Sequence, residues 1–131
     1  MSERNFRIGL TAILLPVLAT AATPASAQAG DATKGKAVFA RCAICHSVEP
    51  GVKKMGPTLS GVFGRKAGTT DFAYSPAMKA AKLTWNAKTL DSYVTKPAAL
   101  VPQTKMMFPG IANPVDRSNL IAYLEQATKA K

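Results

Sequence analysis

The sequence predicts an all-α domain in which three main helices and a few short helices are joined by long loops. Apolar residues recur at helical spacing in three segments, and each segment begins at a residue that caps helices. No stretch of any length alternates polar and apolar residues as a half-buried strand would. The segments between the helices are rich in Gly and Pro, which favours irregular loops.

The first 27 residues have the pattern of a cleaved secretory signal peptide. Two arginines precede an apolar stretch over residues 8–22, and a small-residue cleavage site ends at Ala27. An uncleaved membrane anchor is the alternative, but this stretch has only about 15 residues, fewer than the ~20 that span a bilayer. We therefore expect cleavage before Gln28, export to the periplasm, and one domain over residues 28–131.

The net charge of the chain indicates which kind of partner it binds. The 131 residues include 17 Lys and Arg against 7 Asp and Glu, a formal net charge of +10. The basic residues are dispersed, and no basic stripe is interleaved with aromatic residues, so we do not expect a nucleic-acid partner. The excess of positive charge favours a protein partner with an acidic docking face.

The first predicted helix runs from Ala32 to about Arg41. Asp31 can cap its first turn, because a short acidic side chain accepts hydrogen bonds from free backbone N–H groups. Gly35 lies one turn before Phe39 and permits the close approach of another helix.

The next five residues carry the strongest chemical signal in the chain. Cys42 and Cys45 are three positions apart and are followed directly by His46, which is the attachment pattern of a c-type haem. One turn of chain can present both sulfur atoms to the vinyl groups of one porphyrin, and His46 can then reach the iron. His46 is the only histidine in the sequence.

A pair of cysteines at this spacing has other possible roles. It can be a redox dithiol, half of a zinc site or a short-loop disulfide. Zinc would require a fourth strong ligand, and the chain has no third cysteine and no second histidine. A thioredoxin-like dithiol requires a βαβ context, which the sequence does not predict.

Residues 47–84 are expected to form loops around a ligand. Eight Gly and Pro residues interrupt this segment, and only residues 76–81 suggest a short helix. A long irregular segment inside a small domain needs a ligand to organise it.

Two helices follow in the second half of the chain. Asn86 can cap a helix over residues 87–96, and a second loop covers residues 98–108. The last helix has Asn113 as its candidate cap and Pro114 at its first position. Its apolar face consists of Leu120, Ile121, Tyr123 and Leu124.

The second axial position of a haem iron could be filled by methionine, lysine, water or nothing. Met106 and Met107 lie in a loop with prolines at both ends, residues 102–109, which suits a fixed ligand. Met55 and Met78 are expected to be packing residues, because a methionine is more often core filler than ligand.

Several motifs occur in order along residues 30–130: GDATKGKAVF, CAICHSVEPG, GPTLSGVFGRKAG, LTW, TKMMFPG and LIAYL. Together they resemble the class I cytochromes c, and most of all the small soluble bacterial type related to mitochondrial cytochrome c. The resemblance implies the class I cytochrome c fold around one haem c, bonded to Cys42 and Cys45. It also implies that His46 and Met106 are the iron ligands, because the family's ligand directly follows Thr-Lys.

The resemblance assigns further residues to the haem pocket. The carbonyl of Pro57 would accept a hydrogen bond from His46 Nδ1, which orients the ring. Phe108 would lie against the haem near its exposed edge. The remaining residues would surround the propionates (Arg65, Tyr74 and Trp85) or form a polar network beside the methionine ligand (Tyr93 and Thr104).

The sequence departs from the family pattern at the pocket and at the docking face. Met78 stands where the family usually has a small polar residue that binds a buried water. Ala98 and Ala99 replace lysines that often flank the docking face. The basic residues that remain on this face are Arg41, Lys54 and Lys105.

The implied function is that of a diffusible, monomeric one-electron carrier, and not of an enzyme. Its expected partners are membrane redox complexes with acidic docking faces: a cytochrome bc-type reductase and a cytochrome oxidase or photosynthetic reaction centre. An open-site haem enzyme or gas-binding cytochrome is one alternative and would need a vacant sixth position. A membrane-anchored cytochrome subunit is the other and would retain the N-terminal segment.

Overall fold

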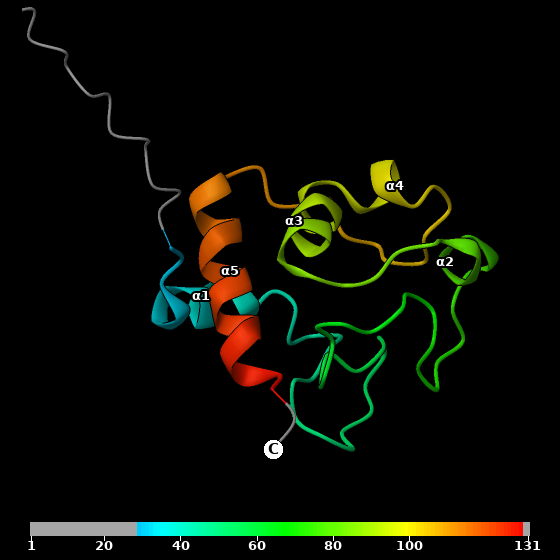
Figure 1. Ribbon diagram of the computed structural model, residues 1–131, viewed down its shortest axis with the longest axis horizontal. Helices are drawn as coiled ribbons and strands as arrows, with labels where there is room; N and C mark the ends of the chain where they lie inside the picture. The colour runs from blue at the N-terminus through cyan, green and yellow to red at the C-terminus, as the bar shows by residue number, and fades with distance from the viewer. Residues whose placement is uncertain (1–28, 130–131) are drawn as a thin grey trace, which may run out of the picture.

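The computed structural model describes residues 29–129, and the predicted signal peptide over residues 1–27 lies outside this range. The described part is helical, as the sequence predicts, and its single antiparallel bridge joins Lys66 to Thr84. In chain order the helices are α1 (Ala32–Phe39), α2 (Pro76–Ala80), α3 (Ala87–Thr95), α4 (Pro97–Leu100) and α5 (Pro114–Ala127) (Figure 1).

The first and last helices cross in direct contact (Figure 1). A Cβ atom on Gly35 would lie only 1.9 Å from the carbonyl oxygen of Asn119, so this position requires glycine. The backbone N–H of Asp31 donates to Asn119 Oδ1 at 2.8 Å, and the rings of Phe39 and Tyr123 are 5.2 Å apart. The close crossing that Gly35 predicts is therefore present.

The structure differs from the sequence-based expectation in the end of one helix and in one additional helix. Helix α1 ends at Phe39 rather than near Arg41, because the backbone N–H groups of Cys42 and Ala43 turn back to the carbonyl of Phe39. Helix α4 lies in a segment expected to be a loop. Pro97 ends α3 as predicted, but its fixed φ also starts the next helical turn.

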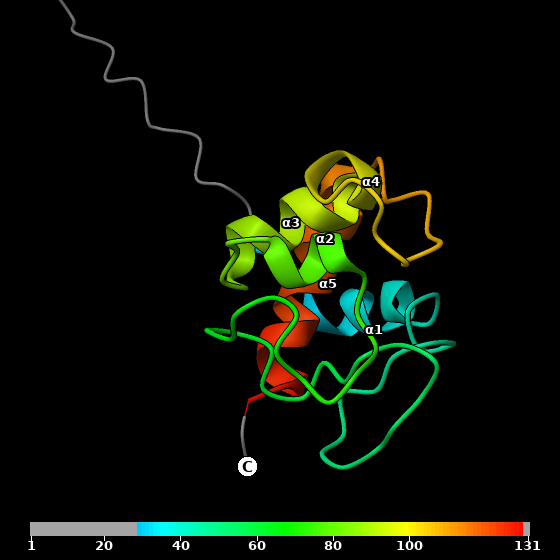
Figure 2. The same ribbon diagram turned by 90° about the vertical axis from the view of Figure 1, so that its right-hand side faces the viewer.

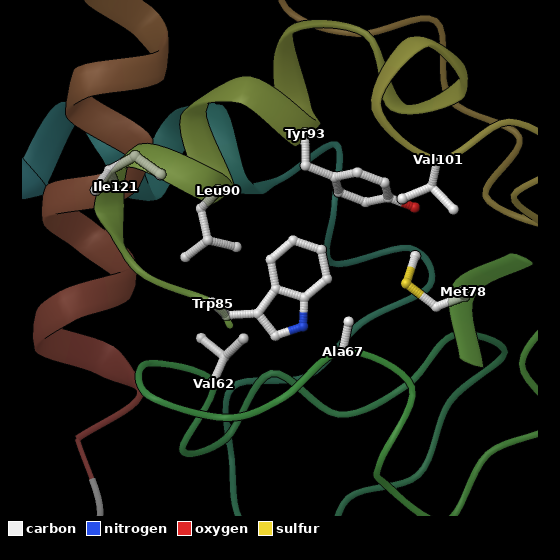
Figure 3. Packing of buried hydrophobic residues seen from close by; sticks show 8 residues of the cluster. All are labelled: Val62, Ala67, Met78, Trp85, Leu90, Tyr93, Val101 and Ile121. Atoms are coloured by element: carbon white, nitrogen blue, oxygen red, sulfur yellow. The ribbon is translucent and has the colours of Figure 1, made fainter. Parts of the chain in front are cut away.

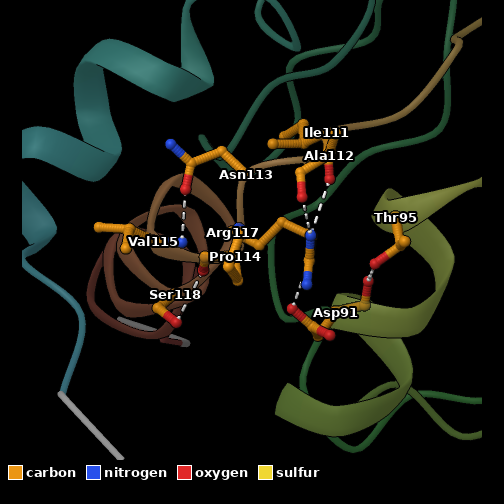
Figure 4. A network of polar contacts seen from close by, with 9 residues as sticks. All are labelled: Asp91, Thr95, Ile111, Ala112, Asn113, Pro114, Val115, Arg117 and Ser118. Carbon is orange, nitrogen blue, oxygen red and sulfur yellow. Dashed lines mark hydrogen bonds and ion pairs between the residues drawn. The ribbon is translucent and has the colours of Figure 1, made fainter.

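The side chain of Arg117 joins α5 to α3 and to the segment just before α5 (Figure 4). Arg117 Nε donates to the carboxylate of Asp91 on α3 at 2.8 Å, and the Arg117 side chain is only 13% exposed. Its Nη1 donates to the carbonyls of Ile111 and Ala112, both at 2.9 Å. We call residues 102–109, which include Met106 and Met107, the methionine loop. The guanidinium of Arg117 therefore fixes the segment that follows this loop and leads into α5.

The loops and the short helices enclose the interior from different sides. Both views place residues 47–75, in green, below α3 and α4 (Figures 1 and 2). A buried cluster packs between these parts of the chain (Figure 3). It consists of Val62, Ala67, Met78, Trp85, Leu90, Tyr93, Val101 and Ile121.

Within residues 29–129, no helix combines the length and apolar character needed to cross a membrane.

Candidate functional site

A cavity of about 690 Å³ lies between the loops and the helices. This volume falls in the range of roughly 300–1,000 Å³ that is usual for small-molecule and cofactor sites. The cavity is lined by the two cysteines and the histidine of the attachment motif, and by Met106 from the opposite half of the chain. The fold thus brings together, around one space, all four residues predicted to bind a haem: Cys42, Cys45, His46 and Met106.

The imidazole of His46 is oriented by a hydrogen bond to the backbone. Its Nδ1 lies 2.7 Å from the carbonyl oxygen of Pro57, and because a carbonyl only accepts, Nδ1 carries the proton. This leaves the lone pair on Nε2. A Cβ atom on Gly56 would lie 2.7 Å from His46 Cε1, so glycine is needed to seat the ring.

The surroundings of His46 favour its neutral form. Burial lowers the pKa of His46, the hydrogen bond to Pro57 opposes this shift, and the positive charge of Lys54 adds to it. A neutral imidazole with one free nitrogen is the form that ligates a metal ion. The hydrogen bond to Pro57 is therefore the kind of outer contact that fixes a metal ligand.

The two cysteines lie on one turn of chain and are not joined in a disulfide. The backbone N–H groups of Cys45 and His46 both donate to the carbonyl of Cys42, which keeps both thiols at the cavity wall. The pKa of Cys42 is raised to about 11, mainly because the thiol is buried. The positive charge of Arg41 opposes this shift, and Cys45 adds to it. A redox dithiol needs a low thiol pKa, so this environment does not favour that alternative.

Within residues 29–129, no group of three or more His, Cys, Asp and Glu side chains is placed to hold a metal ion.

Burial distinguishes the two adjacent methionines. Met106 is half-buried, packs against the central cluster and lines the cavity, whereas Met107 is 98% exposed. Thr104 Oγ1 accepts a hydrogen bond from the Met106 backbone N–H at 3.3 Å and lies 2.7 Å from the hydroxyl of Tyr93. The predicted polar pair thus lies directly beside Met106.

The other two methionines have different environments. Met78 is 7% exposed within the central cluster, so its interpretation as a packing residue is confirmed (Figure 3). The same interpretation is wrong for Met55, which is 73% exposed. Met55 lies in an exposed loop segment, residues 49–55, where no second layer of chain covers it.

The three residues expected around the propionates all line the cavity. Arg65 donates to the carbonyls of Thr58 and Ser60, both at 2.7 Å. Burial lowers the pKa of Arg65, and Tyr74 partly opposes this shift. Trp85 packs against Tyr93 with ring centroids 5.2 Å apart (Figure 3). Phe108, expected near the exposed edge, also lines the cavity and is half-buried.

The basic residues expected on the docking face are exposed and lie around the attachment turn and the cavity. Arg41 and Lys105 line the cavity, and Lys54 donates to the carbonyl of Ala43 in the attachment turn. Lys105 Nζ also donates to the carbonyl of Ala73 at 2.8 Å, which ties the methionine loop to the loop before α2.

Several residues of the cavity wall were not singled out from the sequence, and two of them are instructive. Phe72 lines the cavity and packs edge-on against Tyr74, with ring centroids 5.0 Å apart. An aromatic residue two positions before Tyr74 in a Gly-rich loop was the available signal. Leu59 also lines the cavity and joins the two buried clusters, but no sequence pattern distinguishes it from an ordinary core leucine.

The sequence matches a family profile and is similar to several known proteins. The sequence profile of the cytochrome c family matches residues 32–128. The chain is 51% identical over 100 residues to a cytochrome c2 of Rhodoblastus acidophilus, covering 75% of this chain and 94% of that protein. It is 45% identical over 105 residues to a cytochrome c of Gossypium barbadense, covering 78% and 95%.

A solved structure shares the fold. Cytochrome cH from Methylobacterium extorquens superposes with a TM-score of 0.70 at 43% sequence identity, covering 74% of this chain and 99% of that one.

Proposed function

The chain belongs to the cytochrome c family, and we propose that His46 and Met106 would hold the iron of its haem. Like its cytochrome c2 relatives, the chain is an electron carrier with a covalently bound haem c. When bound, this group supplies an iron that takes up and releases one electron. The observation that supports the ligand assignment is that His46, Met106 and both cysteines line one cavity.

The cysteines and the histidine fit this group. Both thiols are free and half-buried at the cavity wall, as thioether formation requires. His46 Nε2 carries a lone pair, because Nδ1 donates to the Pro57 carbonyl at 2.7 Å. That hydrogen bond holds the ring in one orientation and increases the basicity of the coordinating nitrogen.

Met106 supplies the second ligand. Its thioether sulfur is a soft donor, which favours ferrous iron and raises the reduction potential relative to two histidine ligands. Thr104 accepts a hydrogen bond from the Met106 backbone N–H, so the loop presents this methionine and not its neighbour. Met107 also borders the cavity, but it is 98% exposed and, unlike Met106, does not pack against the central cluster.

Two protein ligands leave no coordination position for a substrate, so the chain acts as a carrier and not as an enzyme. This argument disfavours the open-site haem enzyme and the gas-binding cytochrome.

The site of action and the partners follow from the surface and the N-terminal pattern. Cleavage before Gln28 would release a monomer into the periplasm, in contrast to a membrane-anchored subunit. Its partners would be a cytochrome bc-type reductase and a cytochrome oxidase or photosynthetic reaction centre. The net charge of +10 favours acidic docking faces on these complexes.

The ligand assignment is tested by replacing each adjacent methionine in the haem-loaded protein. Met106→Ala should abolish the weak red absorption band that marks ferric iron bonded to methionine sulfur, and it should lower the midpoint potential. Met107→Ala, the matched control, should retain both properties. Loss of the band in Met107→Ala alone would show that the assignment is wrong.

A further inference from the structure

All four methionines of residues 29–129 line the cavity, but solvent reaches them unequally. Met107 is 98% exposed and Met55 is 73% exposed, whereas Met78 is 7% exposed within the central cluster (Figure 3). Met106 is half-buried and packs against the same cluster. Two thioether sulfurs are therefore open to a dissolved reagent, and the fold shields the other two.

The two exposed methionines contribute nothing to the packing. Met107 and Met55 belong to neither buried cluster, and neither is packed against one of them. Iron ligation requires one methionine, for which Met106 is proposed. The chemistry that distinguishes Met107 and Met55 from an exposed leucine is that of their sulfur atoms, because a thioether is a soft and polarizable nucleophile.

An exposed thioether can take an oxygen atom from a hydroperoxide. A sulfur lone pair attacks one oxygen of hydrogen peroxide, the O–O bond breaks, and a sulfur–oxygen bond forms. The proton of the transferred oxygen passes to the departing hydroxide, which leaves as water. The sulfur loses two electrons and becomes a sulfoxide, while the peroxide is reduced. The reaction needs contact between peroxide and sulfur, so its rate follows the exposure of the sulfur.

We propose that Met107 and Met55 are reversible oxidation sites, which accept oxygen from hydrogen peroxide while Met106 and Met78 stay reduced. Sulfoxide formation converts two flexible apolar groups at the cavity wall into polar ones and leaves the buried cluster unchanged. The exposure of the two sites is independent of the proposed function. The protection of Met106 rests partly on it, because a sulfur that donates a lone pair to iron is a weaker nucleophile.

Exposure also makes the modification repairable. Methionine sulfoxide is reduced by methionine sulfoxide reductases, and each of the two sulfoxide epimers has its own enzyme. In this step two thiols become a disulfide, and the oxygen leaves as water. Such an enzyme must enclose the modified side chain, which the exposed positions of Met107 and Met55 permit. The same repair at Met78 would require the central cluster to open.

The test treats the haem-loaded ferric protein with hydrogen peroxide and follows each methionine over time. Tandem mass spectrometry of tryptic peptides assigns the added oxygen to Met106 or to Met107, although the two are adjacent. Met107 and Met55 should react within about threefold of the rate of N-acetylmethionine amide, and about tenfold or more faster than Met106 and Met78. The red absorption band should persist when Met107 and Met55 are fully oxidised.

Matched variants identify the reacting atoms. Met107→Leu and Met55→Leu replace the thioether by an inert apolar side chain of similar volume. In the fast phase the wild type should gain two oxygen atoms, each single variant one, and the double variant none. Treatment of the oxidised wild type with both classes of reductase and a dithiol should restore the original mass.

The outcomes distinguish this inference from the proposed ligand. Oxidation of Met106 or Met78 as fast as Met107 would overturn the selectivity, and sulfoxides that resist both reductases would overturn the reversibility. Slow oxidation of Met107 and Met55, at the rate of Met78, would overturn the sites themselves. An untreated wild type without the red band would overturn the ligand assignment alone, because the order of oxidation is read from peptide masses.

Discussion

The hydroxyl groups of Tyr93 and Thr104 lie 2.7 Å apart, and the same Thr104 oxygen accepts the backbone N–H of Met106 at 3.3 Å. Tyr93 is 7% exposed on α3, so its position is fixed by packing. Through Thr104, this buried phenol is coupled to the methionine loop. The geometry of the loop therefore depends on α3 as well as on its own prolines.

Replacement of Thr104 tests this coupling. Thr104→Val keeps the shape of the side chain but removes the oxygen that joins Tyr93 to Met106, which should weaken iron–methionine bonding by about 1–2 kcal/mol. At alkaline pH a deprotonated lysine can replace a methionine ligand, so the red absorption band of the ferric protein should then disappear at a lower pH than in the wild type. Thr104→Ser retains the hydroxyl and should behave like the wild type. An unchanged pH midpoint in Thr104→Val would contradict the coupling.

The crossing of α1 and α5 should not tolerate a methyl group at Gly35. A Cβ atom there would lie 1.9 Å from the Asn119 carbonyl oxygen, so Gly35→Ala must separate the two helices. We expect a loss of about 3 kcal/mol or more in the free energy of unfolding, measured by urea denaturation. Lys36→Ala on the exposed side of the same helix should have little effect. Near-equal stability of the two variants would refute the steric explanation.

The Asp91–Arg117 ion pair should contribute measurably to stability because the guanidinium is largely buried. Asp91→Asn removes the charge but leaves the two carbonyl partners of Arg117, so we expect a loss of about 1 kcal/mol. Arg117→Met removes all of these bonds and should cost more. A double-mutant cycle with both changes measures the pair directly, and zero coupling energy would mean that the carbonyls alone hold Arg117.

Acid titration should report the exposed ion pair between Lys53 and Asp71. Lys53 Nζ lies 2.6 Å from Asp71 Oδ2, and this hydrogen bond and charge lower the pKa of Asp71. The pair therefore adds stability above pH about 4, which is lost as the pH falls through the lowered pKa. Carbon NMR of Asp71 should show a midpoint below the ordinary value, and Lys53→Gln should return it to that value. An Asp71 midpoint that does not respond to the variant would show that the pair does not persist in solution.

Much of the helical structure could be predicted from local sequence features. Asn86, Asn113 and Asp31 each accept hydrogen bonds from the first turn of the helix that they were expected to cap. The end of α1 and the existence of α4 could not be predicted in this way. Both depend on how the chain turns after a helix, which is decided by tertiary packing and not by residue preference.

The site was predictable where its chemistry requires a fixed spacing. The attachment motif singles out Cys42, Cys45 and His46, and in the structure these three residues and Met106 line one cavity. The exposure of Met55 was not predictable, because periodicity says nothing about a residue in an irregular loop. Such a residue is positioned only when distant segments close around the same space.

The contact between α1 and α5 has a consequence for how the chain is made. The backbone bond from Asp31 to Asn119 joins positions 88 residues apart, and Gly35 has no partner until α5 exists. A ribosome must therefore complete almost the whole polypeptide before its first helix can find its packing surface. Until then the nascent chain cannot form its native core, so it remains unfolded while synthesis continues.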